Sequence, residues 1–226
     1  MRTYPAGDLT KAKLYEKARE VFYESGYNKA SMKEVCQRAD VKQSVFYYHY
    51  KDKSEPAKKL YENFGKAHSR AITEEIINKR YTTSVVITNC ICSALLLLNS
   101  IQDPKIGRFW AEMYTDNLTA NIGFHRHFHE NMYRKSGLPF DQNDFEFFLI
   151  NCASINCSLM LNYFDGRFQV TPEELARYKT KHTLRYLEYS NEEIAQMTDK
   201  VIEIAAKIPI TAGENFEIKI DNNIIF

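Results

Sequence analysis

A short stretch between Ser31 and Lys53 carries the side chains best suited to recognising another molecule. It reads SMKEVCQRADVKQSVFYYHYKDK. Ser31, followed three residues later by Glu34, has the pattern of a capping box and predicts the start of a helix. Apolar residues then recur at the spacing of one buried helix face: Met32, Val35, Cys36 and Ala39.

A second short helix is expected from about Gln43 to Tyr50. Phe46 and Tyr50 lie one turn apart and can reach the same core, whereas Ser44 and Tyr48 point to the opposite side. Hydroxyl, amide and ammonium groups bind base edges and phosphates. A helix that exposes tyrosines among lysines is therefore typical of the recognition helix in a helix-turn-helix.

Two other clusters contain residue types that bind metals. His125 and His129 are one helical turn apart, with Glu130 beside them, but surface or pocket histidines explain this pattern better than a metal site. Cys90 and Cys92 point in different directions on a helix, which disfavours a metal or redox pair. The sequence has no Gly-rich phosphate loop, nucleophile elbow or HExxH motif. We expect neither an enzyme nor a bound metal or cofactor.

Charge is unevenly distributed along the chain. Residues 1–60 carry 13 Lys and Arg against 8 Asp and Glu, whereas the remaining residues carry 17 against 21. A basic head on an acidic body predicts a polyanion-binding N-terminus. The start lacks the apolar core of a signal peptide, and the longest apolar run, about 85–98, is too short to span a membrane. With five cysteines in no paired framework, these features predict a cytoplasmic protein without a membrane partner.

These side chains must be positioned by helices. A helix from about Thr10 to Ser25, ended by Gly26, would complete a three-helix head, and one continuous helix over 54–80 would link it to the body. The periodicity predicts further helices, followed by a tail that alternates like a short β-hairpin: about 84–100, one opening at 103–104, then 117–136, 142–165, 171–189, 191–207, and the tail 213–226. The expected fold is all-α, with a helix-turn-helix domain over 1–53 and a helical domain over 54–226.

Residues 10–60 resemble the DNA-binding domain of the tetracycline-repressor (TetR) family of bacterial regulators. The similar segments are AREVFYESGYNKASMKEVCQRA, DV and KQSVFYYHYKDKSEPAKKLY, and the aromatic run before Lys51 and Lys53 is the most specific part. Two positions depart from the family pattern. Asp40 replaces the usual Gly of the turn but tolerates unusual backbone angles, and Lys42 replaces the usual capping Ser and adds a charge that can seek phosphate.

The resemblance implies which residues contact DNA. Positions that face the major groove correspond to Gln43, Ser44, Val45, Tyr48 and His49, and Lys33 corresponds to a position that sometimes reaches a base. Phosphate-contact positions correspond to Ser31, Met32, Tyr47 and Lys53. Packing of Tyr47 or Tyr48 against neighbouring helices stays open as an alternative, and Lys51 is expected to be a solvated charge.

The resemblance also implies a ligand-responsive regulator, most simply a repressor, that binds a palindromic operator as a homodimer. Helices 142–165 and 172–189 would form the dimer interface, with Ser154, Cys157, Ser158 and Leu161 at the seam and Cys152, Asn156, Leu159 and Tyr163 facing inward. Residues that suit either a pocket for a small apolar or aromatic effector or a plain core are Trp110, Met113, Tyr114, Phe128, Cys152, Asn156 and Tyr163. The main rival is a metal- or ligand-binding sensor whose helix pair contacts proteins, and an enzyme is a more distant one. Salt dependence would separate DNA binding from the sensor.

Overall fold

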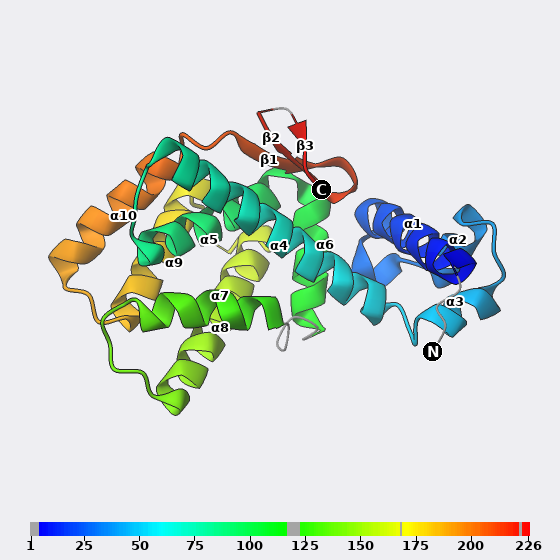
Figure 1. Cartoon of the computed structure of the whole chain (residues 1–226), viewed down its shortest axis with the longest axis horizontal. Helices are drawn as coiled ribbons and strands as arrows, with labels where there is room; N and C mark the ends of the chain where they lie inside the picture. The colour runs from blue at the N-terminus through cyan, green and yellow to red at the C-terminus, as the bar shows by residue number, and fades with distance from the viewer. Residues whose placement is uncertain (1–4, 117–122, 168, 222) are drawn as a thin grey trace.

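The computed structural model describes residues 5–116, 123–167, 169–221 and 223–226, without the side chains of residues 5, 6 and 123–125. Within these ranges the chain is helical apart from a small C-terminal sheet, as the all-α prediction requires. The head, at one end of the molecule in Figure 1, consists of α1 (Pro5–Lys29), α2 (Met32–Arg38) and α3 (Gln43–His49). The predicted three-helix head is thus confirmed.

Helix α4 (Ser54–Lys79) leaves the head and runs across the body (Figure 1). The body contains α5 (Val85–Gln102), α6 (Pro104–Thr115), α7 (Gly123–Arg134), α8 (Gln142–Phe164), α9 (Pro172–Tyr186) and α10 (Asn191–Ala205). Helix α5 is apolar nearly all round and lies at the centre, packed against α4, α6, α9 and α10. The expected helix over 117–136 is described only from Gly123, because 117–122 lie outside the described residues.

Helix starts follow the capping chemistry of the sequence in most places. The side chains of Ser84 and Asp103 accept backbone N–H groups at the starts of α5 and α6, and Thr171 and Ser190 form capping boxes on α9 and α10. At Ser31 the predicted helix start is confirmed but the capping box is absent, and at the start of α4 no hydroxyl caps the helix.

Ser31 lies at the N-cap position of α2, but its side chain makes no capping hydrogen bond. The Glu34 carboxylate does not reach back to it and binds Arg38 one turn later at 2.6 Å. At α4, Ser54 is the first helical residue and does not act as the cap. Its backbone N–H is accepted by Asp52 Oδ1 at 2.8 Å. Asp52 thus takes the place of a capping hydroxyl at the start of α4, whereas Arg38 holds the Glu34 side chain away from Ser31.

The head is fastened to the body mainly through α1 and α6. Arg108 donates to the carbonyl of Glu24 at 2.8 Å, and Glu112 accepts the backbone N–H of Asn28 at 2.7 Å. Between them lies Gly26, whose φ of 76° and ψ of 178° require glycine. A Cβ at Gly26 would lie 2.6 Å from Glu112 Oε2, so the junction needs glycine for space as well as for backbone conformation.

The C-terminal tail forms an antiparallel sheet in the order β1-β2-β3, from β1 (Ile210–Gly213), β2 (Glu217–Ile220) and β3 (Asn223–Ile224). The predicted hairpin is confirmed as β2 and β3, whereas β1 was not anticipated. Phe216 is fully buried between head and body, with ring centroids 5.8 Å from Tyr23 and 4.9 Å from Phe109. Arg19 of α1 donates to the carbonyls of Asn215 and Phe226, so the tail also contacts the head.

Candidate nucleic-acid interface

The turn between α2 and α3 has the geometry of a helix-turn-helix. Asp40 adopts φ 53°, so the sequence-based expectation that Asp would accept the conformation usually given to Gly is confirmed. The backbone N–H of Val41 donates to the carbonyl of Cys36 at 3.0 Å and closes the end of α2. Arg38 then joins α2 to α1 by binding Glu24 at 2.6 Å and 2.9 Å. This ion pair lowers the pKa of Glu24 and holds the first two helices together.

Helix α3 is held from behind by an aromatic anchor. Phe46 is fully buried, and its ring lies 5.4 Å from that of Tyr50. The Tyr50 hydroxyl donates to the backbone carbonyl of Lys11 at 3.3 Å, and burial raises the Tyr50 pKa to about 12, so this donor stays protonated. Because α3 is short, its orientation depends on these packing contacts more than on its own helical stability.

The opposite side of α3 faces solvent. Tyr48 is 83% exposed and Tyr47 is 58% exposed, and Gln43 and Ser44 are exposed as well. Within the described part of the chain, none of these four side chains has a hydrogen-bond partner. Packing of Tyr48 into a neighbouring helix is therefore wrong, and Tyr47 only rests one edge on Phe46.

The remaining predicted contact residues surround this face unequally. Ser31, Lys33 and Lys42 are exposed, whereas Met32, Val45 and His49 are half-buried, with Met32 and Val45 packed against the core. Lys53 differs from the others because its ammonium group donates to the carbonyls of Tyr27 and Asn28 at 2.9 Å and 3.1 Å. In this conformation Lys53 holds the end of α1 and keeps one N–H for another partner.

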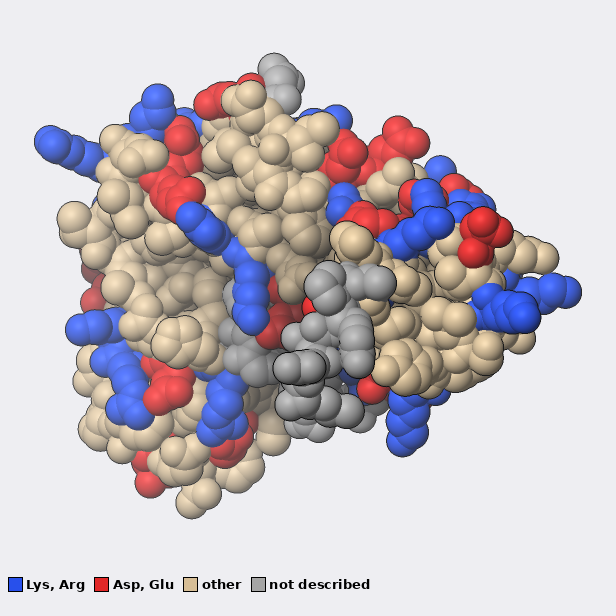
Figure 2. Space-filling model, turned by 45° about the vertical axis from the view of Figure 1, so that its right-hand side comes forward, with Lys and Arg blue, Asp and Glu red and all other residues tan. Residues whose placement is uncertain are grey.

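The charges of the head suit a polyanion at its outer end. Lys33, Lys42 and Lys51 take part in no ion pair with any described residue, in contrast to Arg38. Figure 2 shows Lys and Arg side chains reaching out at the tip and underside of the head, and acidic side chains towards its upper edge. An exposed helix with free amide, hydroxyl and ammonium groups can bind base edges and phosphates.

In the body, the structure brings three of the predicted pocket residues together. Asn156 on α8 donates to the Tyr114 hydroxyl on α6 at 2.6 Å, and that hydroxyl lies 3.4 Å from the hydroxyl of Tyr61 on α4. The Tyr61 ring packs edge-on against buried Trp110 at 4.9 Å. The sequence analysis did not identify Tyr61 or Lys179, although Lys179 on α9 donates to Asn156 Oδ1 at 2.6 Å.

The other four candidates are dispersed around this network. Met113 is fully buried and Cys152 nearly so, whereas Phe128 and Tyr163 are half-buried against the core. Burial raises the pKa of the Cys152 thiol to about 12, so it is a neutral neighbour. These four residues fit core packing as well as they fit a pocket.

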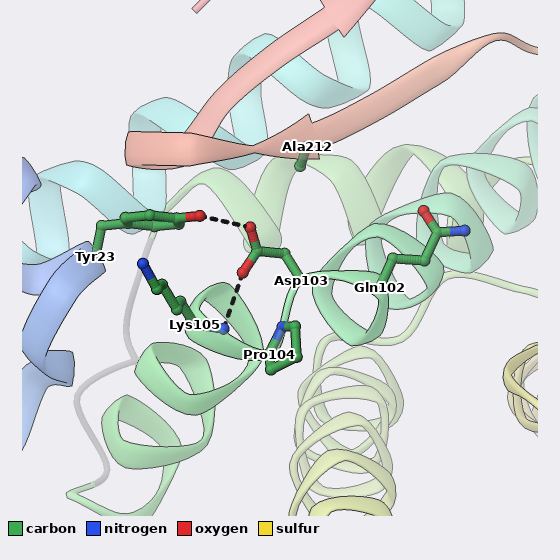
Figure 3. Close-up of a pocket in the computed structure, with 6 residues that line it drawn as sticks. All are labelled: Tyr23, Gln102, Asp103, Pro104, Lys105 and Ala212. Atoms are coloured by element: carbon green, nitrogen blue, oxygen red, sulfur yellow. Dashed lines mark hydrogen bonds between the residues drawn. The ribbon is translucent and has the colours of Figure 1, made fainter.

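An open depression of about 500 Å³ lies elsewhere, at the junction of head and body (Figure 3). None of the predicted pocket residues lines it. Its lining consists of Tyr23, Gln102, Asp103, Pro104, Lys105 and Ala212. Asp103 is already engaged there, because it accepts the Tyr23 hydroxyl at 2.9 Å and caps α6.

His125 and His129 were considered as metal ligands in the sequence analysis. The side chain of His125 lies outside the described residues, and His129 lies against Phe148. Among the side chains that are described, no group of three His, Cys, Asp or Glu residues is arranged to hold a metal ion.

Comparisons with known proteins agree with this geometry. Residues 14–55 match the family described as bacterial regulatory proteins, tetR family. The structure of RolR in complex with resorcinol aligns with a TM-score of 0.65 at 12% identity, over 85% of this chain and 94% of that chain. RolR without ligand gives 0.60 at 14% identity, over 83% and 96%. A TetR transcriptional regulator from Rhodococcus sp. RHA1 gives 0.56 at 13% identity, over 81% and 98%. No curated protein matches the chain.

The two kinds of similarity cover different parts of the molecule. The family match contains most of α1, the whole of α2 and α3 and the start of α4, which are the elements that position the exposed face of α3. The structural similarity extends the fold through the body. The head is therefore similar in sequence to the DNA-binding part of bacterial regulatory proteins of the tetR family, and the chain as a whole shares the fold of RolR and of the Rhodococcus regulator.

Proposed function

We propose that this protein is a transcriptional repressor that binds a palindromic operator as a homodimer and leaves it when a small effector occupies the body. The observation that carries the DNA-binding part is the outward side of α3, where Gln43, Ser44 and Tyr48 are exposed and Phe46 anchors the helix from behind. Residues 1–53 would act as the DNA-binding domain and 54–226 as the effector and dimerisation domain. The protein would work in the cytoplasm, without a membrane and without catalysing a reaction.

The groups on and around this side of α3 can each bind a particular feature of DNA. The Gln43 amide can bind adenine bidentately, and the edge of Val45 that remains accessible can contact a thymine methyl group. Ser31 lies at the N-terminus of α2, where backbone N–H groups attract phosphate. Lys33, Lys42 and Tyr47 would add phosphate or base contacts around this centre.

The dimer would form through α8 and α9. Helix α8 has a mean hydropathy of 1.3 over its most apolar window, of which only 22% is buried, whereas the similarly apolar core helix α5 is 67% buried. Phe147 and Ile150 on α8 are 62% and 61% exposed, and Tyr178 on α9 is 51% exposed. Ser154 and Ser158 continue the same exposed side and would let a partner helix approach closely. A second copy covering this face explains why so much apolar surface is uncovered.

The switch would act on the separation of the two recognition helices. A dimer must place them about 34–36 Å apart to enter successive major grooves. The effector must bind one conformation better than the other, since otherwise the equilibrium does not shift. Helix α4 is suited to transmit the change, because it begins next to the head and carries Tyr61 in the body. The resorcinol complex of RolR supports a small aromatic effector as the type of ligand.

The DNA contacts are tested by selecting binding sites from random duplex DNA and measuring affinity by gel shift. Gln43→Ala should change the preferred sequence and cost about 1–3 kcal/mol on the original site. Lys42→Ala should instead weaken binding to all sequences and lower the slope of log affinity against log salt by about 1. Lys200→Ala, at an exposed position of α10 outside the proposed dimer interface, serves as the control. If both head variants bind as the wild type does, α3 does not read DNA as proposed.

A further inference from the structure

One buried ammonium group in the body has no carboxylate to balance it. Lys179 is 7% exposed, and its Nζ donates to Asn156 Oδ1 at 2.6 Å and to the carbonyl of Ser93 at 3.2 Å. Both partners are neutral, and none of the described residues forms an ion pair with Lys179. An ammonium group has three N–H donors, so one donor and the positive charge itself remain uncompensated. Such a group is costly to bury without an opposite charge.

The nearest titratable neighbours do not supply that charge. The thiols of Cys90 and Cys152 interact with Lys179, but burial raises the pKa of each to about 12. Both are therefore neutral near pH 7. The lysine itself keeps its proton over most of the neutral range, because burial lowers its pKa only to about 8.

Lys179 is one end of a chain of polar contacts that crosses four helices. From α9 it leads through Asn156 on α8 and Tyr114 on α6 to Tyr61 on α4. Beside Tyr61 stands Trp110, whose buried Nε1–H has no hydrogen-bond partner among the described residues. A donor is thus left over at each end of the chain. Asn156 and Tyr114 in its middle are only half-buried, which gives a small solute a way to approach.

We propose that this cluster binds a small aromatic or aliphatic carboxylic acid, with the carboxylate paired to Lys179. The proposal rests on the function proposed above and specifies the chemical class of the effector. The anionic oxygen would complete the charge balance of the ammonium group, and charge-assisted hydrogen bonds are the stronger kind. The apolar part of the acid would lie towards Trp110 and Met113, which are both buried. An uncharged analogue would leave the lysine as costly as before.

The position of the cluster also indicates how the effector would act. Asn156 would have to share Lys179 with the bound acid, and any shift of Asn156 reaches Tyr61 through Tyr114. Tyr61 belongs to α4, the helix that joins the body to the head. The same residues that recognise the acid therefore contact the element that would move the DNA-binding helices.

The test uses the full chain and a panel of acids, each paired with its own amide: benzoate, phenylacetate, hexanoate and octanoate. Binding is measured by calorimetry and by the shift of the melting temperature. At least one acid should bind the wild type about tenfold or more tightly than its amide. Lys179→Met should abolish this preference while leaving amide binding unchanged, and Lys179→Arg should retain part of it. Lys200→Met, at an exposed position of α10 outside the proposed dimer interface, should behave like the wild type.

Two results would overturn the proposal. One is that every amide binds the wild type as tightly as its acid, which needs no variant and so does not depend on the folding of Lys179→Met. The other is that folded Lys179→Met keeps the preference for an acid. Selected operator DNA separates this proposal from the function itself. Sequence-specific DNA binding without acid preference refutes only the acid site, whereas acid binding that leaves DNA affinity unchanged supports the site and refutes the switch.

Discussion

The head and the body use polar side chains on helices in opposite ways. On α3, Gln43 and Tyr48 point into solvent and bind no described residue, while apolar packing fixes the helix behind them. In the body, Lys179 and Asn156 point inward and bind each other. Exposed polar side chains on a firmly packed helix can contact a large partner such as duplex DNA. Polar side chains that point into the body can contact only a small molecule. The direction of the side chains, more than their residue type, separates the two proposed recognition sites.

The largest effect is expected from removing the Phe46 side chain, which anchors α3 in the head. Phe46→Ala would leave a cavity in the small head core and should lower the free energy of unfolding by about 3–5 kcal/mol. DNA binding should be lost with it, because α3 would no longer hold one orientation. Urea denaturation and gel shift measure the two effects. Ile77→Ala, which removes an apolar side chain that is 65% exposed on α4, should change stability by less than about 0.5 kcal/mol.

The close packing of the head against the body can be tested at Gly26. Gly26→Ala should lower the free energy of unfolding by about 1–3 kcal/mol, since alanine is strained at this backbone conformation and its Cβ collides with Glu112. Thermal unfolding measures the loss. Gly137→Ala is the control, because Gly137 also has a positive φ of 95° but a Cβ there would meet nothing within 4 Å. Equal losses in the two variants would show that the contact with Glu112 contributes nothing.

The buried histidine of the body, His68, should make the stability of the protein depend on pH. This side chain on α4 is fully buried beside Asn99, with 2.9 Å between His68 Nε2 and Asn99 Nδ2, and burial lowers its pKa to about 3. Between about pH 6.5 and pH 3 the unfolded chain binds a proton that the folded protein does not. The free energy of unfolding should therefore fall with falling pH, by up to about 1.4 kcal/mol per pH unit.

Replacing His68 tests whether this residue causes the loss of stability at low pH. His68→Gln keeps a hydrogen-bonding side chain for Asn99 but removes the titration, so its stability should change less between pH 6.5 and pH 5 than that of the wild type. Urea denaturation at several pH values measures the slope. The control is His127→Gln, at an exposed position, which should leave the slope as it is. An unchanged slope in His68→Gln would assign the acid sensitivity to other groups.

The smallest expected effect concerns the outward face itself. Tyr48→Ala should alter the free energy of unfolding by less than about 0.5 kcal/mol, because the side chain is 83% exposed and packs against little. The same variant should bind the selected operator more weakly. A clear loss of stability would mean that Tyr48 supports the fold and that the face is not free for DNA.

The sequence predicted the head well because its signals are local. The order of the first three helices, the turn at Asp40 and the outward direction of Ser44 and Tyr48 all follow from periodicity within about twenty residues. The capping box at Ser31 is absent for an equally local reason, since the Glu34 carboxylate binds Arg38 instead of reaching back to Ser31. The DNA contacts themselves remain predictions.

The body was harder to predict because its contacts join distant parts of the chain. Trp110, Tyr114 and Asn156 were singled out, but their link through Tyr61 and Lys179 depends on the packing of four helices. A signal for Lys179 did exist. It lies four residues after buried Leu175, on the stripe that α9 turns towards the core, where a lysine is unusual.

The C-terminal sheet has a mechanical consequence for any rearrangement of this molecule. Phe216 is wedged between Tyr23 of the head and Phe109 of the body, and Arg19 grips two carbonyls of the same tail. If the head rotates relative to the body, either the tail moves with the head or Phe216 leaves its position between Tyr23 and Phe109. In the first case the head and the tail move together. In the second case the Phe216 ring is transferred from the core to water, and the free energy of that transfer opposes the movement.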